Sequence, residues 1–154
     1  MEPIISFRDF SFQYRAQKEP TVRHINLDIM PGERVLIAGP SGSGKSTLGN
    51  CINGLIPFSY PGEVRGSLVV DGVNAPQSGI FELSAHVGTV LQDPDGQFIG
   101  LTVAEDIAFA LENSCTPQKE MHEITRRAAE LVHIEDHLDY APHELSGGQK
   151  QRVS

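Results

Sequence analysis

The stretch GPSGSGKS, from Gly39 to Ser46, constrains the fold of this chain more than any other. It matches the pattern G-x-x-x-x-G-K-[ST] and lies between a short apolar run, RVLIA at residues 34–38, and a run of helical character that ends near Gly54. Glycines let such a loop curve its backbone N–H groups toward phosphate oxygens, and the N-terminus of the following helix adds partial positive charge. The sequence therefore predicts a buried strand, a phosphate-binding loop and a helix in succession.

The polar side chains of this loop indicate a nucleoside triphosphate and its metal ion. Lys45 is expected to reach the β- and γ-phosphates, and the hydroxyl of Ser46 is expected to be a ligand of Mg²⁺. The motif by itself does not distinguish kinases, GTPases and motor ATPases, since all of them carry it. The residues of this segment that we predict to bind nucleotide are Gly39, Pro40, Ser41, Gly42, Ser43, Gly44, Lys45, Ser46 and Thr47.

Further apolar runs predict strands in the first part of the chain. FRDFSFQY alternates apolar and polar residues, HINLDIM alternates again, and GSLVVDG ends in an Asp-Gly hairpin turn. Phe10, Phe12 and Tyr14 are expected to share one side of their strand. RVLIA is continuously apolar, and HVGTVLQ, at residues 86–92, is a second candidate for a buried strand. Both are predicted to be strands covered on both faces.

Beyond residue 92 the sequence becomes helical in character. Thr102 with Glu105 forms a capping-box pattern, and Thr116 followed by Pro117 predicts the cap and the first turn of a second helix. Apolar residues at helical spacing predict the buried face of that second helix. They are Ile124, Ala128, Leu131 and Val132.

Length, charge and cysteine content limit the class of protein. A chain of 154 residues fits one domain, which we divide into a β-subdomain with the phosphate-loop core (1–92), a helical subdomain (93–144) and a final segment (145–154). The net charge of −8 argues against non-specific binding to nucleic acid. Cys51 and Cys115 give no disulfide framework, which indicates a reducing compartment. The sequence shows neither a signal peptide nor an apolar run of about 18 residues.

The segment LSGGQ, from Leu145 to Gln149, narrows the class of nucleotide-binding protein. Ser146 and Gln149 match a capping box that opens a helix. Behind a phosphate loop, LSGGQ resembles the signature of ATP-binding cassette (ABC) ATPases. This resemblance implies an α/β fold, with a P-loop NTPase core, an N-terminal antiparallel β-subdomain and a helical insert. It also implies a head-to-tail pair of subunits, in which Ser146 and Gly148 of one subunit cap the γ-phosphate held by the other.

Two more residues acquire roles through the same resemblance. Tyr14 matches the aromatic residue on which adenine stacks, and the alternative for it is core packing beside Phe10 and Phe12. Gln92 matches the glutamine that reaches Mg²⁺ and the attacking water, and the alternative for it is an ordinary loop residue. An amide suits that role because it offers both an acceptor and a donor.

A narrower resemblance covers VLQDPDGQFIGLTVAEDIAFALEN and NGLIP. Both segments are similar to those of the ATPases of energy-coupling-factor (ECF) transporters, which import vitamins and cobalt or nickel ions. The resemblance implies ATP and Mg²⁺ as cofactors and a position at the cytoplasmic face of the membrane. Its implied partners are a second ABC ATPase subunit or domain, a transmembrane coupling subunit and a substrate-binding membrane subunit, without nucleic acid.

Two other functions stay open at this point: an ABC ATPase that acts on nucleic acid or the ribosome, and a nucleotide-binding module without turnover. The 53 positions from Gln92 to Leu145 are too few for a long coiled-coil insert, which disfavours the DNA-repair type. In the ABC ATPases that this sequence resembles, an Asp-Glu pair that helps hold Mg²⁺ and supplies the catalytic base follows the signature, and a switch histidine comes later. Neither occurs up to Ser154. We therefore expect the N-terminal part of an ATPase, cut after the signature, that alone neither hydrolyses ATP nor folds cooperatively.

Metal sites other than that for Mg²⁺ are not expected. His133 and His137 are four positions apart, but HIEDH does not match the zinc motif H-E-x-x-H, so we interpret them as a surface pair. The segment from Asp93 to Gly96 lacks the third acidic position and the closing glutamate of a calcium loop.

Overall fold

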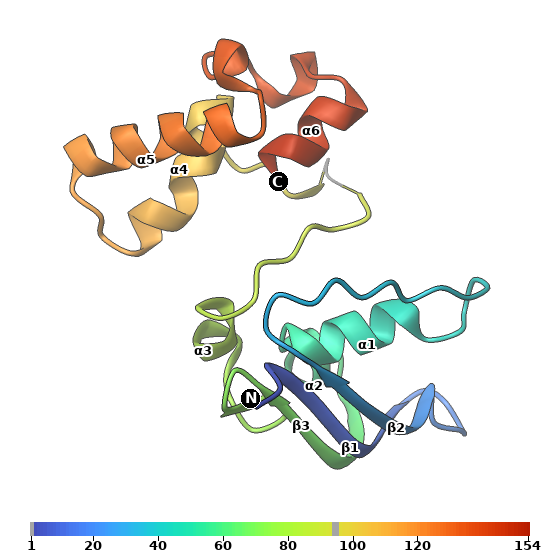
Figure 1. Cartoon of the computed structure of the whole chain (residues 1–154). Coiled ribbons are helices and arrows are strands. Elements are labelled where there is room, and N and C mark those ends of the chain that lie inside the picture. Colours follow the sequence, from blue (N-terminus) through green and yellow to red (C-terminus); the bar gives the residue numbers. More distant parts are fainter. Residues whose placement is uncertain (1, 94–95) are drawn as a thin grey trace. The chain divides into compact units, whose positions relative to one another are not determined.

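The computed structural model describes residues 2–93 and 96–154. Pro94 and Asp95, which belong to the run that resembles ECF ATPases, lie outside the described residues. The chain forms two compact units, Met1–Thr89 and Val90–Ser154 (Figure 1). Each has its own hydrophobic core. Among the described residues, no helix has both the length and the apolar composition needed to cross a membrane.

The first unit is built on an antiparallel sheet with the strand order β2-β1-β3-β4. Its elements are β1 Ile5–Tyr14, β2 Val22–Ile29, α1 Lys45–Ile52, α2 Leu55–Phe58, β3 Gly62–Val70, β4 Val73–Asn74 and α3 Ile80–Ser84. The strands predicted from alternation are confirmed, and so is the turn at Asp71-Gly72, which joins β3 to β4. The antiparallel β-subdomain expected in an α/β chain is thus present.

The core of this unit lies between the sheet and its helices. Phe7, Phe10 and Phe12 of β1 are fully buried and pack with Leu48 and Cys51 of α1. A break in the β1–β3 register between residues 8 and 11 changes the alternation locally. The expected shared side is confirmed in that Phe10 and Phe12 enter the core and the half-buried Tyr14 packs against it.

The two predicted buried strands do not form. Residues 34–38 and 86–92 have no strand assignment, and Leu36 is 90% exposed while Val90 is 62% exposed. A strand of this kind needs hydrogen-bonded neighbours at its edges and cover on both faces. The described residues supply neither, so the prediction of buried strands is wrong for this structure. For the same reason Gln92, expected at the end of a buried strand, lies exposed in a bend.

The second unit is helical. Its elements are α4 Val103–Asn113, α5 Gln118–Leu131, the 3₁₀ helices η2 Glu135–His137 and η3 Pro142–Glu144, and α6 Gly147–Val153. The predicted capping boxes at Thr102 and Ser146 are both confirmed. The predicted cap at Thr116 is wrong by one residue, because Pro117 holds the N-cap position of α5. The N–H of Thr116 instead donates to the carbonyl of Leu111, so this threonine completes the end of α4.

The buried face of α5 also differs from the prediction. Thr125 and Ala129 are buried, whereas Leu131 is 81% exposed and Ile124 is 38% exposed. Ala129 packs in the core of this unit with Val103. Of the predicted set, Ala128 and Val132 are half-buried. The helix therefore buries small side chains, which hydrophobic spacing alone does not identify.

Candidate functional site

The phosphate loop leads directly into α1 and leaves the start of that helix uncapped. The N-cap is Gly44, with φ of 91°, and no side chain caps the helix. A Cβ at this position would lie 3.0 Å from Cγ1 of Val22 and 3.1 Å from the carbonyl oxygen of Thr21. Both the backbone conformation and the lack of space therefore require glycine here. The first N–H groups of α1 are left for a ligand, as an anion site needs.

Lys45 is held inside the curve of its own loop. Its Nζ donates to the carbonyl oxygens of Gly39, at 2.9 Å, and Pro40, at 2.7 Å. A Cβ at Gly39 would lie 2.9 Å from Oγ of Ser43, a contact that rotation of the serine side chain can relieve. The loop thus places a positive charge at its centre, and the residues present fit a bound phosphate chain.

The two residues after Lys45 face different surroundings. Ser46 is exposed, so its hydroxyl is accessible to a metal ion bound with the phosphates. Thr47 is buried, and its Oγ1 lies 3.1 Å from the hydroxyl oxygen of Tyr14. The Tyr14 ring also meets Phe12 edge to face, with centroids 4.8 Å apart. The structure therefore places Tyr14 beside the first turn of α1. Stacking of adenine on its ring stays a prediction.

The signature segment is a closed cap on α6. Oγ of Ser146 accepts from the N–H of Gln149 at 3.4 Å, and Oε1 of Gln149 accepts from the N–H of Ser146 at 2.8 Å. Leu145, only 6% exposed, anchors the segment in the core of the second unit. Gly147 and Gly148 are exposed, and a Cβ at either would meet no atom within 4 Å. The two glycines are thus presented to solvent.

The predicted site residues fall into two groups, one in each unit. The first unit brings together Tyr14 and residues 39–47, while the second contains Gln92, Ser146 and Gly148. The interpretation of His137 as a surface residue is wrong, because the structure places it half-buried, with its Nε2 3.0 Å from Nε2 of the signature residue Gln149. The contact spans twelve positions, so no local pattern could have indicated it.

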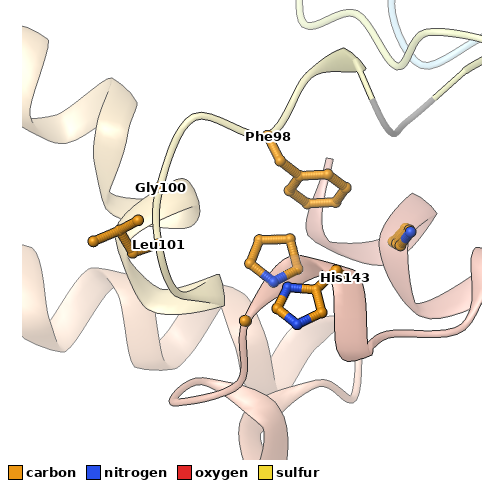
Figure 2. Close-up of a pocket in the computed structure, with 7 residues that line it drawn as sticks. Phe98, Gly100, Leu101 and His143 are labelled. Carbon is orange, nitrogen blue, oxygen red and sulfur yellow. The ribbon is translucent and has the colours of Figure 1, made fainter.

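Two further features of the described chain do not belong to a nucleotide site. Cys51 is buried in α1, and burial raises the pKa of its thiol to about 12, which leaves it unreactive. A hollow of about 420 Å³ in the second unit contains none of the predicted nucleotide-binding residues (Figure 2). It is lined by Phe98, Gly100, Leu101, Ala141, Pro142, His143 and Lys150. The described residues hold no group of three His, Cys, Asp or Glu side chains that could bind a metal ion.

An anion-binding loop at the start of a helix, with a lysine in its centre, defines the chain as a P-loop nucleotide-binding protein of α/β fold. The family model described as "ABC transporter" matches residues 22–154, and the chain belongs to this family. Family membership implies that ATP is the ligand of the phosphate loop.

Relatives of this chain are found in several bacteria. An ABC transporter ATP-binding protein of Lactiplantibacillus plantarum is 62% identical over 152 residues, or 99% of this chain. A protein of the same description from Clostridium perfringens is 61% identical over 151 residues, or 98% of this chain. The chain spans about a quarter of the length of these relatives, 27% in each case.

One solved structure is similar over nearly the whole chain. CbiO1 of Clostridium perfringens, described as part of the ABC transporter complex CbiONQ, has a TM-score of 0.85 and 30% sequence identity. The similarity covers 99% of this chain and 59% of that one. It confirms the fold class as the α/β fold of an ABC ATPase, with its antiparallel β-sheet and helices.

Proposed function

We propose that this chain is part of an ATPase subunit of an ECF-type importer, in which ATP binding and hydrolysis drive uptake of a vitamin or a transition-metal ion. The phosphate loop, where two carbonyl groups accept from Lys45 at the uncapped start of α1, carries the ATP-binding part of the proposal. The likeness to CbiO1, described as part of a transporter complex, supports the ECF type.

Each predicted residue has a role in this proposal. Lys45 and the loop N–H groups bind the β- and γ-phosphates, and Tyr14 stacks on the adenine. Ser46 and Gln92 hold Mg²⁺, which when bound offsets the negative charge of the phosphate oxygens. Ser146 and Gly148 act on the nucleotide of a second subunit in a head-to-tail pair.

The partners follow from the same proposal. A second ABC ATPase subunit or domain completes each nucleotide site, and a transmembrane coupling subunit with a substrate-binding membrane subunit carries out transport. The protein then works at the cytoplasmic face of the membrane. The acidic balance of the chain, −8, disfavours the alternative of an ATPase that acts on nucleic acid or the ribosome.

The test uses the complete protein and its Ser146→Arg variant. The wild type is expected to hydrolyse Mg²⁺-ATP and to pair when ATP is bound, as measured by phosphate release and light scattering. Ser146→Arg should block pairing and leave the affinity of the dilute monomer for ATP unchanged, since the signature serves the partner's site. A large loss of affinity in the monomer would contradict the head-to-tail arrangement, and stimulation of turnover by DNA or ribosomes instead of membrane subunits would favour the alternative.

A further inference from the structure

His137 contacts the signature segment from outside it. The residue lies in η2, and its Nε2 is 3.0 Å from Nε2 of Gln149 in a partly buried position. On its other side the imidazole lies against the ring of Tyr140, with centroids 5.0 Å apart. Because the contact joins two nitrogen atoms, one of them must donate the hydrogen bond and the other must accept it.

The neighbouring hydrogen bond decides the direction. The backbone N–H of Ser146 can only donate, and it lies 2.8 Å from Oε1 of Gln149. The amide oxygen of Gln149 therefore faces Ser146, and its amide nitrogen, which can only donate, faces the imidazole. It follows that Nε2 of His137 is the acceptor and that the ring is neutral, with its proton on Nδ1.

This arrangement leaves Nδ1 of His137 buried and without a hydrogen-bond partner among the described residues. A buried, unpaired N–H destabilises the folded state, and a native structure that keeps one calls for a reason. A leucine of similar size would fill the same space without that cost. Packing alone therefore does not account for a histidine at this position, whereas acceptance from Gln149 does.

The capping box depends on this contact. Its two hydrogen bonds are unequal: the bond from the N–H of Gln149 to Oγ of Ser146 is long, at 3.4 Å, and the bond to the Gln149 side chain is short, at 2.8 Å. The stronger of the two hydrogen bonds thus depends on the flexible side chain of Gln149. His137 restricts that side chain by accepting from its other end.

We propose that His137 is a positioning residue of the signature. By fixing the side chain of Gln149, it holds the capping box closed and keeps Ser146 and the first turn of α6 in the conformation that the partner's nucleotide meets. This inference rests on the proposed function, in which the signature acts on the ATP of a second subunit.

The experiment compares three substitutions at this position in the complete protein. His137→Leu removes the acceptor and keeps the volume. His137→Gln places an amide oxygen near the position of Nε2, whereas His137→Asn ends one bond short of it and is the matched control. We expect kcat for ATP hydrolysis to fall about five- to tenfold in His137→Leu, the range of a lost neutral hydrogen bond, and in His137→Asn. His137→Gln should keep at least half of the wild-type rate.

Binding and stability separate positioning from a merely structural role. The affinity of the dilute monomer for ATP should stay within about twofold of wild type in all three variants, since the phosphate loop is untouched. The melting temperature of His137→Leu should change little, because the loss of the bond to Gln149 and the removal of the unpaired N–H have opposite effects on stability. A double substitution of His137 and Gln149 by leucine should lower kcat no further than Gln149→Leu alone.

Several results would overturn the inference. They are a wild-type kcat in His137→Leu, equal rates in the Gln and Asn variants, and additive losses in the double variant. In each of these cases the wild type would still hydrolyse ATP, so the proposed function would stand. A wild type without ATP hydrolysis would overturn the proposed function and, with it, the positioning role.

Discussion

The chain contains two glycine-rich segments that open a helix, and they differ in how the helix start is satisfied. At α1 the N-cap is Gly44, in a left-handed conformation and without a side-chain cap, and the ammonium of Lys45 donates to a carbonyl group of the preceding loop. At α6 the N-cap is Ser146, in an extended conformation, and both bonds of a capping box are present. Similar glycine content thus produces an open start in one unit and a closed start in the other.

Glycine therefore has two distinct uses at a helix start. In the phosphate loop it permits a backbone curve that leaves N–H groups unpaired until an anion binds. In the signature the capping residue satisfies the helix internally, and the glycines serve only to keep the surface clear of side chains. The first segment is incomplete without a ligand, and the second is complete before any partner arrives.

Removal of the charge from the open start should have the largest effect. Lys45→Ala in the complete protein is expected to lower ATP hydrolysis by roughly a hundredfold or more, as loss of a preorganised electrostatic group does elsewhere. The measurement is steady-state phosphate release, with the thermal melt as a check on folding. Retention of more than a small fraction of the activity would show that Lys45 does not contact the phosphates.

The next largest effect is expected from adding a methyl group to a glycine of the phosphate loop, compared with the same change in the signature. Gly44→Ala forces a positive φ on alanine and brings its Cβ to 3.0 Å from Val22, which should cost about 1–2 kcal/mol from the conformation alone and weaken nucleotide binding. Gly148→Ala is the matched control, because its Cβ meets no atom and alanine favours the helix. Calorimetry on the dilute monomer and thermal melts give both quantities. Equal losses in the two variants would remove the distinction between open and closed starts.

Substitutions of Tyr14 test the side chain that contacts Thr47 in the first turn of α1. Tyr14→Ala should weaken ATP binding by about 1–3 kcal/mol if the ring stacks on adenine. Tyr14→Phe should keep that affinity and lose about 1 kcal/mol of folding stability, because it loses the hydrogen bond with Thr47. Calorimetric titration and denaturant unfolding measure the two effects. Equal affinity in Tyr14→Ala and wild type would identify the ring as a core residue only.

The smallest effect is expected from removing the side-chain cap of α6. Ser146→Ala removes the capping hydroxyl from α6 and should lower stability by about 1 kcal/mol, while the affinity of the dilute monomer for ATP stays unchanged. Denaturant unfolding followed by circular dichroism measures the loss. A stability equal to that of wild type would mean that the 3.4 Å bond to Gln149 contributes nothing to the cap.

Features that depend on neighbours in sequence could be predicted. The antiparallel strands alternate along their own residues, and the caps at Thr102 and Ser146 need only a partner three positions away. The phosphate loop is similarly local. The apolar runs at residues 34–38 and 86–92 could not be placed, since a run of this kind becomes a strand only where partners on both edges are supplied.

Contacts between distant positions were not predictable for a different reason. The hydrogen bond of Tyr14 with Thr47 spans 33 positions, and that of His137 with Gln149 spans twelve. Each depends on the path of the backbone between the two residues, and no spacing in the sequence encodes that path. The prediction of the buried face of α5 was wrong because it relied on large apolar side chains, whereas the core positions are Thr125 and Ala129 and not the larger Leu131.

The burial of Cys51 has a practical consequence for labelling. Its thiol, 2% exposed and with its pKa raised to about 12, should resist alkylation at neutral pH, whereas Cys115 lies exposed between α4 and α5. A maleimide dye should therefore modify Cys115 within the second unit first. Any later reaction at Cys51 would occur only when α1 separates from the sheet, so its rate would report how often the first unit opens and how far bound ATP slows that opening.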